Sequence, residues 1–554
     1  MEPVHWLKSD HILFAIIVIC VLFINMLSLD NNCYWGDDFA AYISEGISIA
    51  DGYFDEQAKL NVLMHPSPLP DEALNGSLVY VWGYPLLLAL VYAFAGFDRS
   101  GFTSVIYYKY PSAIALALLA GILYLFLRRR MGKALSFTLS FLFCLCYEFR
   151  VSINSLYSDL VFLFLAVLSL YLVDIFLDAH SRCNSVKRLL TYSIFLGAAL
   201  WFTYETRLNG ISILFACAMA TLIYYIKNHS KFDIRSSLFL LTPYICFFLL
   251  KLISEAILAP ATTNTSDIAG VTLDLVLGNL ETYYYSIRAW LALIVDDIIT
   301  NRLNTYLPLL TSTGADTYGV ISTFCAAFDR VCVCVVLLIT LFGIITDGIK
   351  RDLHLMLFAV VYLAVVCMLP YNQGIRYVYP VLVLIPVYFG CALNWCSVFV
   401  SSLFKGRYKR LRVGLSTVFA VGICSLILVS SARGIDYAHR NPEIIIPSGP
   451  QDFYRMYAYT PCAIETYNYI NDNTPQDCVI GFIKPRALYL NTKRLSVRTD
   501  INGHSLDEVD FFLCCADVGE EQLTSEWRSK FTKVFSNTEF TLYKKINTRS
   551  ASPP

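Results

Sequence analysis

Two adjacent aspartates, Asp37 and Asp38, follow the first apolar run of this chain and stand between Trp35 and Tyr42. Neighbouring carboxylates repel each other, so the pair favours a role that uses negative charge. One such role is a general base that takes a proton from a hydroxyl group, and another is a ligand of a divalent metal ion. A structural alternative is that Asp38 is the N-cap of an amphipathic helix over 39–50 that lies along a membrane interface. The apolar face of that helix would carry Phe39, Tyr42, Ile43, Ile47 and Ala50.

Other polar residues stand at the ends of later apolar segments. Asp159 opens one segment, Arg207 lies between two, and Arg376 precedes another. The same short connections also hold Arg150, Asn154, Glu205, Asn372 and Gln373. Polar groups are costly inside a bilayer, so their gathering at one level predicts a site at headgroup depth. The structural alternatives are that Asp159 caps a helix and that each arginine reaches lipid headgroups from a helix end.

The composition predicts a polytopic membrane protein. The 554 residues are 56% hydrophobic and 15% charged, against about 25% charged in soluble domains. The mean hydropathy is +0.55, and the apolar residues arrive in blocks. The net charge of −1 and the lack of a Lys/Arg tract argue against a nucleic-acid partner. The first run, 11–29, has no small-residue cleavage pattern after it, so we interpret it as an anchor.

Hydropathy predicts about eleven transmembrane helices. They cover approximately 11–29, 106–127, 134–148, 158–177, 189–204, 210–226, 237–258, 329–346, 353–370, 378–397 and 413–431. The third and fifth are short for a helix that needs ~20 residues to span. The apolar stretch 79–95 is interpreted as a re-entrant or interfacial segment, because counting it as a span breaks the charge pattern.

That charge pattern predicts the orientation. Lys and Arg are frequent in alternate connections, such as 128–133 and 405–412, and sparse in the others. The positive-inside rule therefore places the N-terminus in the cytoplasm. The loops 30–105 and 259–328 then face outward, and residues 1–431 form the membrane module.

The remaining residues, 432–554, predict a small extracytoplasmic α/β domain. Short β-like runs at 477–483, 494–499, 509–517 and 540–546 alternate with helical patterns at 462–472 and 485–491. Four cysteines of this tail could pair if it lies outside the cytoplasm, but their spacing dictates no connectivity. They are Cys462, Cys478, Cys514 and Cys515.

Several stretches resemble a known superfamily in order and spacing. WGDDFAAYISEGISIADG (35–52) resembles the D-(D/E)-x-x-Y signature of the multi-spanning GT-C glycosyltransferases, which use polyprenyl-phosphate-linked sugars and include protein O-mannosyltransferases and the aminoarabinose transferase of lipid A. NSLYSDLVFLFLA (154–166) resembles the segment that bears the second-loop aspartate of the family. TRLNGISIL (206–214) resembles its K/R-x-x-G turn, and RYVYPVLVLIP (376–386) its R-Y-x-x-P segment. GYPLLLALVYAFAG (83–96) resembles its P-P-L segment, although Tyr84 replaces the first proline.

The resemblance implies a reaction and assigns residues to it. A sugar would pass from a polyprenyl phosphate donor to an acceptor hydroxyl at the outer face, with Asp38, rather than Asp37, as general base. Asp159 would orient the acceptor or the sugar. Arg207 and Arg376, with Tyr377, would bind the donor phosphate. Some relatives carry a cation before the P-P-L segment, and Lys109 is a candidate to replace it here. Trp35, Tyr42 and Tyr84 are candidates for stacking on a sugar ring, and any metal ion would bind Asp37 and Asp38.

Other interpretations stay open at this stage. The alternative function is a non-enzymatic lipid or solute transporter, which would favour ionisable residues near the bilayer midplane. Lys251 and Glu255, four residues apart, predict a structural ion pair. Asp296 and Asp297 are interpreted as part of a surface helix, and His65 is only a weak candidate. The expected location is a bacterial inner membrane, and the acceptor would be a glycan, a lipid or a protein.

Overall fold

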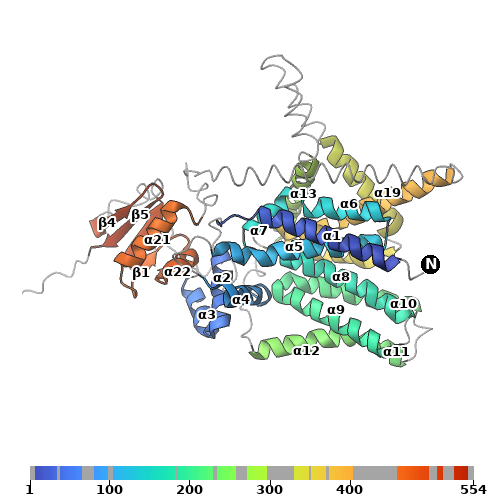
Figure 1. Cartoon of the computed structure of the whole chain (residues 1–554), viewed down its shortest axis with the longest axis horizontal. Helices are drawn as coiled ribbons and strands as arrows, with labels where there is room; N and C mark the ends of the chain where they lie inside the picture. Colours follow the sequence, from blue (N-terminus) through green and yellow to red (C-terminus); the bar gives the residue numbers. More distant parts are fainter. Residues whose placement is uncertain are drawn as a thin grey trace, which may run out of the picture.

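In the computed structural model of the chain, the structure describes residues 6–33, 38–64, 80–97, 104–182, 185–228, 234–257, 271–295, 330–348, 351–369, 374–403, 458–497, 508–515 and 529–546. These residues form a helical bundle with a small sheet-containing domain beyond one end of it (Figure 1). We call this end of the bundle the domain-facing end, and α1 begins at the opposite end. The fold is that of a polytopic α-helical membrane protein with a C-terminal α/β domain, as the sequence predicted.

The bundle consists of long apolar helices and shorter pieces between them. They are α1 (Trp6–Leu27), α5 (Val105–Arg128), α6 (Lys133–Cys144), α7 (Tyr147–Asn154), α8 (Asp159–Arg182), α9 (Val186–Thr206), α10 (Ile211–Asn228), α11 (Ile234–Phe239), α12 (Thr242–Ile257), α13 (Leu273–Val295), a helix within Arg330–Gly348, α17 (Leu353–Cys367), α18 (Tyr379–Leu382) and α19 (Leu384–Leu403). Two short 3-10 turns, η1 (Leu208–Gly210) and η6 (Gly374–Val378), precede α10 and α18.

Seven helical segments of the described chain are long and apolar enough to span a membrane, or eight if a bent pair counts as one span. The predicted number of eleven is therefore not confirmed. The third predicted span is the bent pair, α6 and α7, whose axes differ by 46°. The fifth, α9, has charged residues near both ends, and α17 has only 15 residues. The eleventh, 413–431, lies outside the described residues.

The bundle core is built by close helix contacts. α5 packs against α1 and α8, and α9 packs against α8 and α12. Gly121 of α5 is needed for one of these contacts, because a Cβ atom there would lie 2.5 Å from the Phe14 ring of α1. At the end opposite the domain, buried ion pairs join α5, α8 and the start of α17. Arg130 donates to both carboxylate oxygens of Asp352, at 3.0 and 3.1 Å, and to Asp174 at 3.1 Å.

Three shorter helices cover the domain-facing end: α2 (Asp38–Asp51), α3 (Phe54–Leu63) and α4 (Gly83–Ala95). The helix predicted over 39–50 is confirmed, but its amphipathic character is not. Residues 39–48 of α2 are all buried, whereas Ala50, assigned to the apolar face, is exposed. The reason is that α2 is covered by α4 and also by the C-terminal domain. At 13 residues α4 is too short to span a membrane, in agreement with the interpretation of 79–95.

The C-terminal domain has a five-stranded sheet of order β2-β1-β3-β5-β4. Its elements are α21 (Pro461–Asn473), β1 (Val479–Gly481), α22 (Pro485–Thr492), β2 (Leu495–Val497), β3 (Phe511–Cys515), β4 (Phe531–Ser536) and β5 (Phe540–Lys545). β1 pairs in parallel with β2 and β3, and β5 is antiparallel to β3 and β4. Both helices and four strands match the predicted segments, but β4 was missed. The four tail cysteines are free thiols in this structure.

Candidate active site at the domain-facing end

Two acids and two arginines that are remote in sequence meet at the domain-facing end. Asp38 is the first residue of α2, and its Oδ2 lies 4.0 Å from Nη2 of Arg376 in η6. Asp159 is the first residue of α8 and forms an ion pair with Arg207, the residue that follows α9. Asp38, Asp159 and Arg207 thus lie at helix ends, and Arg376 lies in a 3-10 turn. The structure brings together four of the residues that the sequence selected.

Both guanidinium groups lie over the ring of the same tyrosine, Tyr377. The Tyr377 ring centre is 4.8 Å from the guanidinium carbon of Arg207 and 5.7 Å from that of Arg376. Arg376 also lies over the ring of Tyr157 at 4.2 Å. The hydroxyl of Tyr362 donates to the carbonyl of Tyr377 at 2.8 Å and holds η6 in place. Aromatic faces attract cations, so these rings stabilise the positive charges of both arginines.

The two acids differ in accessibility. The Asp38 side chain is 33% exposed, whereas the Asp159 side chain is 4% exposed and is occupied by Arg207. A base must come within hydrogen-bond reach of the hydroxyl that it deprotonates. Asp38 is therefore the acid that a molecule outside the protein can reach, whereas the carboxylate of Asp159 is held by Arg207.

Tyr80, which the sequence reasoning missed, contacts Asp38 directly. Its hydroxyl donates to Oδ1 of Asp38 at 2.8 Å. Burial, with the nearby Asp38 charge, raises the pKa of Tyr80 well above its usual value, so the hydroxyl keeps its proton and remains a donor. Gly83 allows the start of α4 to lie against α9, because a Cβ atom there would be 2.7 Å from the backbone of Glu205. The residue types around 80–83 offered no signal for this contact.

The structure contradicts the stacking role predicted for Tyr42 and Tyr84. Both are buried, and their rings contact each other at 5.0 Å between centres. The Tyr80 ring covers Tyr42 at 4.2 Å. The hydroxyl of Tyr42 lies 3.1 Å from that of Ser158, and the hydroxyl of Tyr84 lies near Ser112. These rings have no free face for a sugar, because they pack together beneath the site.

The structure also contradicts the phosphate-binding role predicted for Lys109. Its ammonium is fully buried and lies 2.5 Å from Oδ1 of Asp30. It also donates to the carbonyls of Asp30 and Asn32 and to the side chain of Asn154. An ammonium has three protons, and these oxygens occupy them. Lys109 therefore holds the loop before α2, because its ammonium is bound by Asp30 and Asn32 of that loop.

Some predicted residues cannot be placed. Trp35, Asp37, His65, Asn372, Gln373, Asp296 and Asp297 lie outside the described residues. Within the part of the chain that the structure describes, no group of three or more His, Cys, Asp or Glu residues is arranged to hold a metal ion. The predicted Lys251–Glu255 ion pair is confirmed, at 2.5 Å.

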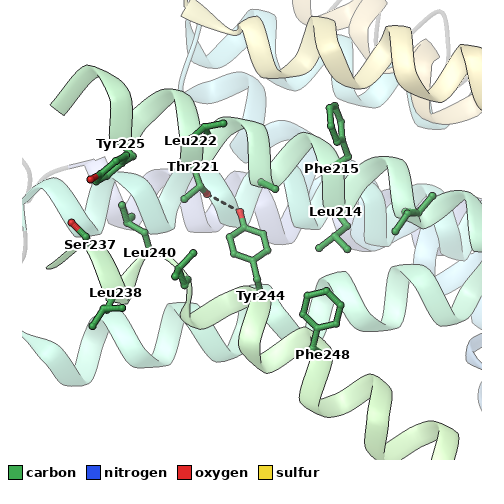
Figure 2. A pocket seen from close by; sticks show the side chains of 13 residues that line it. Leu214, Phe215, Thr221, Leu222, Tyr225, Ser237, Leu238, Leu240, Tyr244 and Phe248 are labelled. Carbon is green, nitrogen blue, oxygen red and sulfur yellow. Dashed lines mark hydrogen bonds between the residues drawn. The ribbon is translucent and has the colours of Figure 1, made fainter. Parts of the chain in front are cut away.

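An apolar groove of about 860 Å³ runs between α10, α11 and α12. Figure 2 shows Leu214 and Leu222 of α10 and Phe248 of α12 among its lining residues. A hydrogen bond of 2.7 Å between Thr221 and Tyr244 crosses it. The groove's lining residues on α10 run from Ile211, which follows Arg207 by four residues, to Tyr225.

Fold and site together define a multi-pass membrane protein with an acid–arginine site at one end of its helices. No protein-family model matches the sequence, and no curated protein matches it either. The structure is similar to a crystal structure of ArnT from Cupriavidus metallidurans bound to undecaprenyl phosphate, with 11% identity and a TM-score of 0.51 over 98% of this chain and 99% of that chain. It is also similar to the oligosaccharyltransferase AglB from Archaeoglobus fulgidus in complex with an inhibitory peptide and a dolichol-phosphate, with 10% identity and a TM-score of 0.51 over 99% of this chain and 75% of that chain. At such low identity the likeness shows the shared fold, which is the one that the sequence resemblance implied.

Proposed function

We propose that this protein is a glycosyltransferase that moves a sugar from a polyprenyl phosphate to an acceptor hydroxyl. One observation carries the proposal: an accessible carboxylate, Asp38, lies 4.0 Å from Arg376, and Arg376 and Arg207 both lie over the ring of Tyr377 at the domain-facing end. The ArnT structure contains undecaprenyl phosphate, and the AglB structure contains a dolichol-phosphate. The structural similarity supports a polyprenyl phosphate as the lipid, and the acid and arginine side chains support sugar transfer from it.

The arginines would bind the donor phosphate and stabilise the leaving group. As the bond between the anomeric carbon and the phosphate oxygen breaks, its electron pair stays on the phosphate, which gains negative charge. Arg376 is the more available of the two, since its neighbour Asp38 is 4.0 Å away. Arg207 stays paired with Asp159, which orients its guanidinium plane. Donors placed where charge develops are the main source of catalysis in such a site.

Asp38 would act as the general base. Its carboxylate takes the proton of the acceptor hydroxyl while that oxygen forms a bond to the anomeric carbon. The products are the glycosylated acceptor, the polyprenyl phosphate and a protonated Asp38, so charge and atoms balance. Asp37 and Trp35 remain candidates for contact with the acceptor or the sugar on the sequence argument alone.

The groove between α10 and α12 would hold the polyprenyl chain. It is apolar, it begins four residues from Arg207, and it continues to Tyr225 near the other end of α10. That segment of α10 is ~20 Å long at 1.5 Å per residue. A donor whose phosphate lies at Arg207 can therefore bury its isoprenoid chain without bending away from the protein.

We further propose that the domain-facing end lies on the extracytoplasmic side of a bacterial inner membrane, from the Lys/Arg distribution. The transporter alternative is not favoured, because the buried ion pairs Arg130–Asp352 and Arg207–Asp159 of the described residues lie at the two ends of the bundle. The acceptor would be a glycan, a lipid or a protein.

The test is transfer by the purified protein in lipid nanodiscs. Polyprenyl phosphates that carry radiolabelled hexoses or pentoses are incubated with the wild type and with a cell-envelope extract as acceptor. The expected result is enzyme-dependent movement of label to an acceptor with release of polyprenyl phosphate. Binding of the lipid without any transfer, together with its movement across vesicles, would instead support the transporter.

A further inference from the structure

Tyr80 connects Asp38 to a buried glutamate. Its hydroxyl donates to Asp38, and its backbone N–H donates to Oε1 of Glu45 at 3.2 Å. Glu45 lies on α2 two turns after Asp38 and has no exposed surface. Tyr80, in the segment before α4, is thus hydrogen-bonded to α2 at two positions, Asp38 and Glu45. The position of the Tyr80 hydroxyl, and through it that of Asp38, depends on Glu45.

Glu45 belongs to a buried polar cluster between α2 and α3. Asn61 donates to its Oε1 at 3.0 Å, and Gln57 donates to Asn61 at 2.9 Å. The second oxygen of Glu45, Oε2, has no hydrogen-bond partner among the described residues. Burial raises the pKa of Glu45 to about 8, while Arg486 and the bonds from Tyr80 and Asn61 act in the opposite direction. A buried acid that is not fully satisfied is costly, so its retention here calls for a reason.

The C-terminal domain places a positive charge, that of Arg486, near enough to favour the charged form of Glu45. Arg486, the second residue of α22, is buried, and α22 packs against α2, as Figure 1 shows. The domain also holds the loop before Asp38. The N–H of Ala458 donates to the carbonyl of Cys33 at 2.6 Å, and that of Tyr459 donates to the side chain of Asn32 at 2.9 Å. The domain therefore contacts the segments on both sides of Asp38.

We propose that Tyr80 is a positioning residue for Asp38, and that the C-terminal domain sets the place of Tyr80 through Arg486 and Glu45. The inference rests on the proposed function and adds a role for the domain in it. Tyr80 fixes one oxygen of Asp38, so the other is directed toward Arg376 and the acceptor. The guanidinium of Arg486 stabilises the charged form of Glu45, which accepts from the backbone of Tyr80. The domain is then part of the active site although it contributes no atom to the reacting groups.

The first experiment compares Tyr80→Phe with Tyr108→Phe in the transfer assay. Tyr108 is a buried tyrosine of α5 whose hydroxyl donates to a backbone carbonyl, that of Gly96, at 3.1 Å. Loss of a hydrogen bond to a charged group predicts a roughly 10- to 100-fold lower kcat for Tyr80→Phe. The KM for the donor should stay within about twofold, and the acidic limb of the pH–rate profile should move to higher pH. If the two variants have equal kcat, the positioning role is wrong.

The second experiment needs no catalytic activity. Thermal unfolding of the purified full-length protein is followed from pH 5 to pH 9 for the wild type, Arg486→Gln and Glu45→Gln, with Lys493→Gln at the end of α22 as control. The folded protein holds a proton on Glu45 that the unfolded chain releases, so this group makes stability fall as pH rises between about 4.5 and about 8. In Arg486→Gln the fall should extend to higher pH, and in Glu45→Gln it should disappear.

The outcomes separate the two proposals. If the wild type transfers no sugar but Arg486→Gln changes the pH dependence as described, the proposed function fails and the link between the domain and Glu45 stands. If the wild type transfers sugar and Arg486→Gln behaves like Lys493→Gln in the unfolding experiment, the role of the domain is refuted.

Discussion

Replacing Asp38 by Asn separates the reaction from binding. The amide has the shape of the carboxylate and keeps an oxygen that accepts from the Tyr80 hydroxyl, so the local structure should persist. It cannot take a proton from an acceptor. A general base contributes about 10²- to 10⁴-fold, so transfer should fall by that factor.

The same change should strengthen binding of the lipid phosphate. At 4.0 Å the attraction between Asp38 and Arg376 is at most about 4 kcal/mol with an effective dielectric constant near 20. Because a third of the Asp38 side chain is exposed, screening reduces this to ~1 kcal/mol. Removing the charge frees Arg376 for the phosphate, and we expect polyprenyl phosphate to bind about fivefold more tightly.

The assay measures transfer and lipid affinity on the same preparations in nanodiscs. Asp51→Asn is the matched control, since Asp51 is at the other end of α2 and accepts from the hydroxyl of Tyr92 at 3.1 Å. It should change neither quantity. Undiminished transfer by the Asp38 variant would refute the base assignment. Weaker lipid binding by this variant would show that Asp38 and Arg376 do not compete as we argue.

Further variants test the other parts of the site. Arg376→Gln should weaken polyprenyl phosphate binding by about tenfold or more in a titration, since a desolvated guanidinium–phosphate contact is lost; unchanged affinity would remove Arg376 from the phosphate site. Ala218→Trp should fill the apolar groove, and should weaken binding of the long-chain lipid but not of a short-chain analogue; equal effects on both would exclude a chain-binding groove. Lys109→Met should lower stability by about 2–4 kcal/mol, because Asp30 and two carbonyls lose their buried donor, while Lys251→Met, whose ion pair is partly exposed, should cost less than about 1 kcal/mol. Unfolding midpoints decide this, and equal losses would contradict the structural role of Lys109.

The local sequence was sufficient to predict where most of the helices and strands lie. Apolar blocks located ten of the predicted spanning segments at helices of the described chain, and period-2 runs located four strands of the C-terminal domain. These features depend on the hydrophobicity and periodicity of adjacent residues, which the sequence contains directly. The number of spans was less certain, because a bend such as that between α6 and α7 depends on neighbouring helices.

The sequence analysis identified only some of the residues that form the site. Asp38, Asp159, Arg207 and Arg376 were selected as polar residues at the ends of apolar segments, because such residues are costly in a bilayer and seldom without a role. Tyr80 and Tyr157, which contact Asp38 and Arg376, were not selected, because no local pattern marks them. The sequence alone could not tell that Lys109 is occupied by Asp30.

The tertiary structure decided which of these groups are available. It buried both faces of α2 under α4 and the C-terminal domain, so Tyr42 became a packing residue. It brought Tyr80 to Asp38 and Arg486 toward Glu45. The sequence by itself determined which residues are polar, apolar or charged and where the helices run. Only the packing determined which charge is neutralised and which stays exposed, because pairing and desolvation depend on groups that are distant along the chain and adjacent in space.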